Sequence, residues 1–471
     1  MAISSTASAQ TLTAPIPGHI TLGNGIFDNA IEGYEVEERF LSGTARRYET
    51  TTVPTEGGEW DLTPAGEAKY RTRLVIVRPK DASKFNGTVV VEWLNVSGGT
   101  DAAPDWNFFH RELIRSGFAY VAVSAQKVGL DGGTMAFPGV QPIKLADPVR
   151  YGSLVHPGDA YAFDIFGQAG HAVKQGASNG LLSNLKVRHV LADGESQSAA
   201  FLTSYVNGVD PLDRVFDGFL IHSRFAGAAP LDGDYLTGMM EQGSNVARMP
   251  VRLRPDVRVP VLTVITETDL MAPSRGYLAA RQSDTAKIRT WEIAGTAHAD
   301  SYILTGAALD TGHAPIAALA KAFTPSSDLF GQKLVKPMNA APQHHYVMQA
   351  ALSALDNWVR TGTSPEPRPV LEADASGLKT DSLGNATGGI RSPWLDVPTS
   401  KLSGLGQPPG GFAFLFGSTE PFDTSELARL YPGGKDEYLR KFASALDDAI
   451  AAGNILAADR AEILALAAEL Y

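Results

Sequence analysis

Short apolar runs rich in β-branched residues recur along the chain and alternate with segments of helical spacing. The runs are typical of buried strands and lie at residues 87–99, 118–126, 187–194, 216–223, 260–267 and 288–295. Helical spacing occurs at residues 105–117, 159–176, 198–208, 272–282 and 344–362. Two earlier segments, 34–49 and 70–79, alternate apolar and polar residues as strands do. Strands that alternate with helices predict an α/β fold with a mainly parallel sheet covered by helices on both faces.

The same pattern divides the chain into an irregular N-terminal arm, a main domain and a C-terminal extension. The arm spans residues 1–30, the main domain 31–362 and the extension 363–471. An insertion at about 224–258 includes a predicted helix and could form a cap over the carboxyl edge of the sheet. A second insertion, 299–342, is expected to be irregular. The extension begins with a stretch rich in Pro, Gly and Ser, and its end predicts two or three helices that pack back on the core.

Composition narrows the classes of function. The chain has 471 residues, of which 44% are hydrophobic, so it can bury a large core. A net charge of -11 argues against nucleic acid and anionic membranes as partners. The absence of cysteine excludes disulfides, thiolate catalysis and Cys-based metal sites. No apolar run approaches the roughly 20 residues that span a bilayer.

The first residues leave the compartment open. Ala7-Ser8-Ala9 is similar to the end of a signal-peptide cleavage site, but neither a basic nor an apolar region precedes it. One interpretation is an exported, periplasmic protein, and the other is a cytoplasmic protein with a disordered tail. The sequence does not indicate an oligomeric state.

The clearest candidate for chemistry is the segment Gly194-Glu195-Ser196-Gln197-Ser198, which follows a predicted strand and precedes a predicted helix. In a nucleophile elbow, G-x-S-x-G, the serine lies on a strained turn between a strand and a helix, and its neighbours must be small. Ser198 replaces the last glycine, which adds little bulk. An N-cap serine would explain the motif alone, but the flanking strand and helix favour Ser196 as a nucleophile.

A serine nucleophile needs a histidine base and an acid that orients it. In a fold with this order of strands and helices, both follow the serine in the chain, the acid first and the histidine second. His298 follows the strand predicted at 288–295, and Glu267 and Asp269 follow the strand at 260–267. Asp269 is favoured because "TETDL" aligns it with the aspartate of the "AExDPL" loop found in many esterases. Glu267 remains the alternative. If it is not the acid, we expect its carboxylate to accept hydrogen bonds from nearby backbone amides.

An oxyanion hole needs two fixed N–H donors. The backbone amide of Gln197, directly after the nucleophile, is the first candidate. The loop "EWLNVSGGTD" after an early strand supplies the second, for which we choose Val96, with Asn95 and Ser97 as alternatives.

Other residues are interpreted as structural. His222 ends a strand near the site and is expected to be a buried, hydrogen-bonded histidine. His344 and His345 begin a helix, and because adjacent residues do not share a helix face, a metal pair is not expected. The sequence has no metalloprotease, P-loop or dinucleotide-binding motif, so no metal and no cofactor are predicted.

Several long segments resemble a family of large bacterial alpha/beta-hydrolase domain proteins. They include "VVVEWLNVSGGTDAAPDW", "VLADGESQSAAFLTSYVN", "PVLTVITETDL", "WEIAGTAHADSY" and "PQHHYVMQAALSALDNWV", and the resemblance covers about residues 15 to 470. It implies the alpha/beta-hydrolase fold with Ser196 as nucleophile and His298 as base. The expected function is a serine esterase acting on a small-molecule ester. Lactone or amide hydrolysis, acyl transfer, and an inactive binding protein are the alternatives.

Overall fold

A single nine-stranded sheet organises the chain. The computed structural model describes residues 10–22, 31–133, 139–235, 249–273, 275–409 and 411–471. The strand order is β1-β2-β3-β5-β4-β6-β7-β8-β9. The strands are β1 Thr11–Leu12, β2 Tyr34–Thr50, β3 Leu62–Pro79, β4 Thr88–Trp93, β5 Ala119–Val123, β6 His189–Glu195, β7 Gly218–His222, β8 Val261–Thr266 and β9 Ile288–Ile293. Strands β4 to β9 are parallel, and β1, β2 and β3 are antiparallel additions. The predicted mainly parallel sheet is confirmed.

Helices cover both faces of this sheet. On one face lie α1 (Pro104–Arg115) and α12 (Gln343–Thr361), and on the other lie α5 (Ala162–Lys174) and α6 (Gln197–Ser204). Because side chains alternate along a strand, Val90 of β4 joins the core on the α1 side, whereas Val89 and Val91 join the core on the α5 side. The predicted α/β layering is therefore confirmed.

Shorter elements connect these layers. The helices are α2 Lys127–Asp131, α3 Ile143–Ala146, α4 Pro148–Tyr151, α7 Asp210–Asp213, α9 Glu267–Met271, α10 Ala307–Leu309, α11 Ile316–Ala322, α13 Pro393–Asp396, α14 Thr424–Leu430, α15 Gly434–Ala451 and α16 Arg460–Leu470. The hairpins pair β10 Asp328–Leu329 with β11 Gln332–Lys333, β12 Ala373–Asp374 with β13 Gly377–Leu378, and β14 Ser400–Ser403 with β15 Ser418–Pro421. None of the described helices combines the length and apolarity that crossing a bilayer requires.

Local differences from the sequence predictions have simple causes. The prediction of a helix at 272–282 is wrong: the described residues of this range form a single 3-10 turn, Tyr277–Ala280. Pro273 and Gly276 disfavour a longer helix. The Ala-rich segment of α11 makes part of the expected irregular insertion helical. In the expected irregular arm, β1 pairs with β2. The helix predicted within 224–258, and Ala7-Ser8-Ala9, fall on residues outside the described part.

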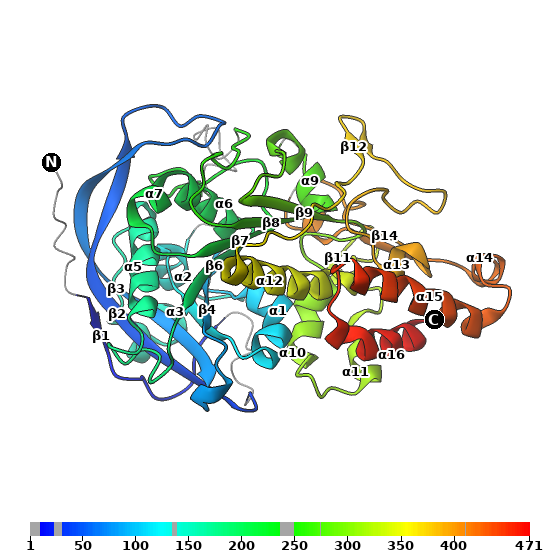
Figure 1. The fold of residues 1–471 in the computed structure, drawn as a ribbon, viewed down its shortest axis with the longest axis horizontal. Coiled ribbons are helices and arrows are strands. Elements are labelled where there is room, and N and C mark those ends of the chain that lie inside the picture. The colour runs from blue at the N-terminus through cyan, green and yellow to red at the C-terminus, as the bar shows by residue number, and fades with distance from the viewer. Residues whose placement is uncertain (1–9, 23–30, 134–138, 236–248, 274, 410) are drawn as a thin grey trace.

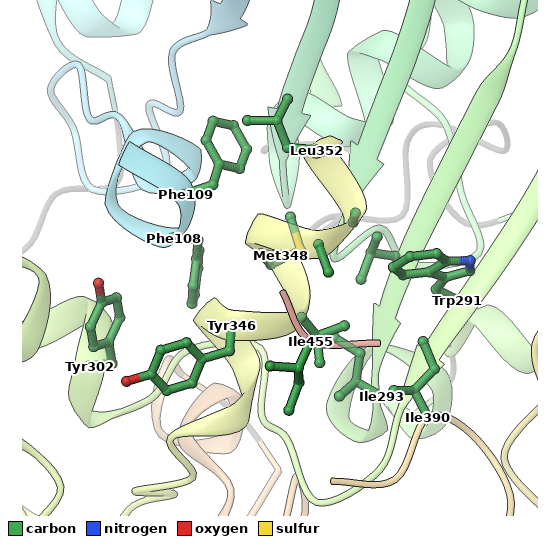
Figure 2. Close-up of a cluster of buried hydrophobic side chains, with 14 of the residues drawn as sticks. Phe108, Phe109, Trp291, Ile293, Tyr302, Tyr346, Met348, Leu352, Ile390 and Ile455 are labelled. Carbon is green, nitrogen blue, oxygen red and sulfur yellow. The ribbon is translucent and has the colours of Figure 1, made fainter. Parts of the chain in front are cut away.

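The C-terminal helices share a core with the α12 face of the sheet. Figure 1 shows α15 and α16 at the end of the molecule opposite the long strands β2 and β3. In the close-up of Figure 2, Ile455 lies beside Ile293 of β9 and Tyr346 of α12. The Tyr346 hydroxyl also donates a hydrogen bond to Glu462 of α16 at 2.8 Å. The extension is therefore integrated with the sheet rather than appended to it.

A fully buried ion pair lies beside the loop that follows β4. The guanidinium of Arg73 is 2.6 Å from Asp101 and 3.4 Å from Glu38, and all three side chains are inaccessible to solvent. Arg73 also donates a hydrogen bond to the Ser124 hydroxyl at 2.9 Å. Glu38 has a second cation, Arg150, at 2.6 Å.

Candidate active site

The turn between β6 and α6 presents Ser196 in a strained conformation. Its φ of 59° and ψ of -116° lie where non-glycine residues rarely occur, and such strain costs about 1–3 kcal/mol. The Ser196 amide donates to the carbonyl of His222 on the neighbouring strand β7 at 2.9 Å. The sheet thus holds the turn at the carboxyl edge of its central strands.

The turn depends on close contact between β6 and α6, and Gly194 makes that contact possible. A Cβ at Gly194 would lie 3.0 Å from Ser198 Cβ and 3.1 Å from Leu202 Cδ1. We expect Gly194→Ala to lower the free energy of unfolding by about 1–3 kcal/mol, as overpacking does. Denaturant unfolding measures this loss. Gly57→Ala is the control, since its nearest neighbour would be Thr55 Oγ1 at 3.8 Å, and an equal loss in both variants would contradict the prediction.

The structure brings Ser196, His298 and Asp269 into one hydrogen-bonded row. His298 Nε2 lies 2.9 Å from Ser196 Oγ, and His298 Nδ1 lies 2.6 Å from Asp269 Oδ1. Asp269 is fully buried and His298 nearly so. The ring of Phe225 stacks on the imidazole with centroids 5.2 Å apart and restricts its rotation.

Asp269 is fixed by the first turn of α9. Its Oδ2 accepts hydrogen bonds from the amide and the hydroxyl of Thr266 at 2.8 and 2.7 Å. Burial raises the pKa of Asp269, but the charge of His298 and these hydrogen bonds outweigh burial and hold the pKa below its ordinary value. The carboxylate is therefore ionised at neutral pH and can accept a hydrogen bond from His298 Nδ1–H.

Glu267, the alternative acid, faces away from this row. Its carboxylate accepts hydrogen bonds from the amides of Gly295 and Gly404 at 2.5 and 2.8 Å, and from the Ser403 hydroxyl at 3.0 Å. Burial raises its pKa to about 7. Glu267 thus ties the end of β8 to the loop after β9 and to the C-terminal extension.

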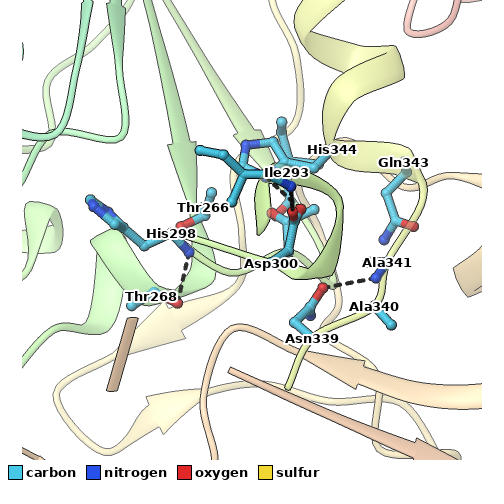
Figure 3. A network of polar contacts seen from close by, with 12 residues as sticks. Thr266, Thr268, Ile293, His298, Asp300, Asn339, Ala340, Ala341, Gln343 and His344 are labelled. Atoms are coloured by element: carbon cyan, nitrogen blue, oxygen red, sulfur yellow. Dashed lines mark hydrogen bonds and ion pairs between the residues drawn. The ribbon is translucent and has the colours of Figure 1, made fainter. Parts of the chain in front are cut away.

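The loop that contains His298 is held from several sides (Figure 3). The His298 amide donates to Thr268 Oγ1 at 3.2 Å. Directly after it in the chain, the amide of Ala299 donates to the carbonyl of Leu415 at 3.0 Å, and the amide of Ser301 donates to the carbonyl of Asn339 at 2.9 Å. Leu415 belongs to the C-terminal extension, so that extension helps to position the imidazole.

The loop after β4 is tied to the turn of Ser196. Asn95 Nδ2 donates to the carbonyl oxygen of Glu195 at 3.1 Å and to its carboxylate at 3.0 Å. The Asn95 amide donates to Ala102, and the Ser97 amide donates to the Asn95 side chain at 2.8 Å. Among the described hydrogen bonds none is donated by the amide of Val96. Of the three candidates for the second oxyanion donor, Val96 is therefore the one whose N–H has no described acceptor.

Glu195 is a site residue that sequence reasoning passed over. Its Oε1 lies 3.2 Å from His298 Nε2, the same nitrogen that faces Ser196 Oγ. Burial, above all, raises the pKa of Glu195 well above its ordinary value. The sequence signal for Glu195 is its position directly before Ser196 in the elbow, which places its side chain near the site.

Two groups of side chains in the described residues are close enough together to surround a cation. One is Asp310, His345 and Glu462, and the other is Glu92, Asp105 and Asp193. In the first, the guanidinium of Arg111 already bridges Asp310 and Glu462. In the second, Glu92 accepts hydrogen bonds from the amides of Asp105 and Trp106. We assign no metal to either group.

Comparison with known proteins agrees with this architecture. A family model described as an alpha/beta hydrolase domain matches residues 4–465. The chain belongs to this family. Members of the alpha/beta hydrolase family share a strand–elbow–helix unit of the kind seen at Ser196. No curated protein matches the sequence significantly.

Solved structures similar to this alpha/beta hydrolase include three esterases. The esterase Est22 is 9% identical, with a TM-score of 0.28, over 50% of this chain and 64% of the other. A glucuronoyl esterase from Teredinibacter turnerae is 14% identical, with a TM-score of 0.27, over 58% and 65%. An acetyl xylan esterase from Paenibacillus sp. R4 is 12% identical, with a TM-score of 0.29, over 60% and 82%. The chain thus spans slightly less than two thirds of the first two.

Proposed function

We propose that this alpha/beta hydrolase is a serine esterase that cleaves carboxylic esters of small molecules through an acyl-enzyme. The observation that supports this most directly is the row of hydrogen bonds from Ser196 through His298 to a buried, ionised Asp269. A serine becomes nucleophilic when a neighbouring base can take its proton. The ionised Asp269 beside His298 Nδ1 favours the tautomer with its proton on Nδ1, which leaves Nε2 free to act as that base.

In the proposed first step, Ser196 Oγ attacks the ester carbonyl while His298 Nε2 takes its proton. Asp269 accepts the Nδ1–H bond and stabilises the imidazolium that forms. The amides of Gln197 and Val96 donate to the developing oxyanion. The imidazolium then returns the proton to the departing alkoxide, which leaves an acyl ester on Ser196.

In the proposed second step, water attacks the acyl ester while His298 again acts as base. The carboxylic acid departs and Ser196 regains its proton. Gln197 is well placed for both steps, because it opens α6 and its side chain is fixed by a 2.7 Å hydrogen bond to Gln126. The first amides of a helix have no partner within the helix and are available to an oxyanion.

Labelling with a fluorophosphonate probe tests this proposal, beside hydrolysis of p-nitrophenyl esters of increasing acyl length. We expect the wild-type protein to be labelled at Ser196 and to hydrolyse short esters, and Ser196→Ala to do neither. A folded wild-type protein that is neither labelled nor active on esters would contradict the proposal. Labelling with activity confined to lactones, amides or acyl transfer would replace the ester assignment and keep the nucleophile.

A further inference from the structure

Behind the catalytic row, four buried side chains form a second hydrogen-bonded chain that the proposed mechanism does not use. Asp105 Oδ1 lies 2.7 Å from His222 Nδ1, and His222 Nε2 lies 3.0 Å from His344 Nε2. His344 Nδ1 lies 3.2 Å from Asp300 Oδ2. All four side chains are inaccessible to solvent or nearly so, and Asp300 follows His298 by two residues.

Proton counting restricts the states of this chain. Each of its three contacts needs one proton, and the two Nε2 atoms that face each other can share only one. With both imidazoles neutral, the hydrogen bonds must all point the same way. Either Asp105 is protonated and Asp300 is the final acceptor, or Asp300 is protonated and Asp105 is the final acceptor. A third state places an imidazolium between two ionised carboxylates.

The surroundings disfavour an imidazolium. The ring of Phe108 packs against both histidines, with centroids 5.1 Å from His222 and 4.2 Å from His344. His344 lies in the first turn of α12, where the positive end of the helix dipole repels a cation. Burial lowers the pKa of His222 well below its ordinary value, so the His222 ring is neutral.

The Asp105 end of the chain favours a protonated carboxyl. Asp105 forms a compact cluster with Glu92 and Asp193, in which three ionised carboxylates would repel one another. Glu92 accepts hydrogen bonds from the amides of Asp105 and Trp106 and from the Tyr120 hydroxyl. These donors stabilise a negative charge on Glu92 and oppose the burial that raises its pKa. Burial raises the pKa of Asp105 to about 8, although a hydrogen bond with Asp193 and the neighbouring His344 oppose the rise.

The position of the Asp300 carboxyl group favours a role as hydrogen-bond acceptor. Its Oδ1 accepts the amide of Ile303 at 3.0 Å, at the beginning of the helical segment that follows. A carboxylate in this position interacts favourably with the unpaired amides of the first turn. Its Oδ2 faces His344 Nδ1 at 3.2 Å.

We propose that hydrogen bonds run in one direction from Asp105 through His222 and His344 to Asp300, and that His344 is a positioning residue for hydrolysis. The chain fixes Asp300 and with it the loop that presents His298 to Ser196. Figure 3 shows His344, Asp300 and His298 in this order. The positioning part of the inference rests on the proposed function, whereas the proton arrangement does not.

The same chemical change at the two ends tests the direction. In Asp105→Asn the amide N–H replaces the carboxyl O–H as donor to His222, so the chain survives. In Asp300→Asn one of two acceptor oxygens becomes a donor and a hydrogen bond is lost. We expect Asp105→Asn to retain kcat within about threefold, and Asp300→Asn and His344→Ala to lower kcat at least tenfold with little change in KM.

Two measurements test the direction of the hydrogen bonds without depending on enzymatic activity. Long-range ¹H–¹⁵N NMR of the wild-type protein at neutral pH should show His222 as the Nε2–H tautomer and His344 as the Nδ1–H tautomer. Thermal unfolding should show a lower Tm for Asp300→Asn than for Asp105→Asn.

The reverse tautomers, or a larger loss of Tm or kcat in Asp105→Asn than in Asp300→Asn, would overturn the proposed direction. Correct tautomers and Tm order with no ester hydrolysis would instead refute the proposed function alone. Correct tautomers with unchanged kcat in folded Asp300→Asn and His344→Ala would overturn the positioning role.

Discussion

Asp269→Asn is expected to lower kcat/KM for ester hydrolysis by about 10⁴-fold while the protein stays folded. Asparagine would present an N–H, or an uncharged oxygen, to His298 Nδ1 in place of a buried carboxylate at 2.6 Å. The imidazole would then favour the tautomer with its proton on Nε2, which cannot accept the proton of Ser196. A loss of this order is known for the equivalent change in a serine protease triad. Steady-state kinetics, with circular dichroism as the check on folding, measures it.

Glu267→Gln is the matched control, because Glu267 precedes Asp269 by two residues and is equally buried. Its carboxylate serves backbone amides and the Ser403 hydroxyl, so the substitution should lower Tm and leave most of kcat/KM. A much larger loss of kcat/KM in Glu267→Gln than in Asp269→Asn would exchange the two assignments.

Arg73→Met is expected to lower the free energy of unfolding by about 3–5 kcal/mol, because removal of one partner leaves a buried charge uncompensated. Asp101 would lose the cation that lies 2.6 Å away, whereas Glu38 would keep Arg150. Denaturant unfolding at neutral pH measures the loss. Arg460→Met removes an exposed ion pair with Asp447 and should leave stability nearly unchanged, since water already screens that pair. Similar losses in the two variants would contradict the argument.

Elements with strong local patterns were predictable from sequence. The parallel strands appear as β-branched apolar runs, and the elbow at Ser196 combines such a run with small residues and a helix. Loop chemistry also gave an expectation for Glu267, whose carboxylate indeed accepts backbone amides. The 3-10 turn at Tyr277–Ala280 was mistaken for a helix because Ala, Leu and Arg favour helices, while Pro273 and Gly276 interrupt them.

Contacts between distant segments could not be predicted in the same way. Nothing in the local pattern places Leu415 against the loop of His298, or Asp105 against His222. Glu195 was passed over because its importance comes from a 3.2 Å approach to His298, which only the folded chain produces. Such pairs depend on the packing of whole elements, which no short window of sequence describes.

The anchoring of His298 by the C-terminal extension has a consequence for biosynthesis. Domains tend to fold from the N-terminus as the ribosome releases them. The strand and helix around Ser196 can assemble early, but Leu415 and Gly404 emerge much later and complete the surroundings of His298 and Glu267. A nascent chain would therefore hold the proposed nucleophile before the proposed base is in place, and the proposed esterase activity should appear only after residue 415 has left the ribosome.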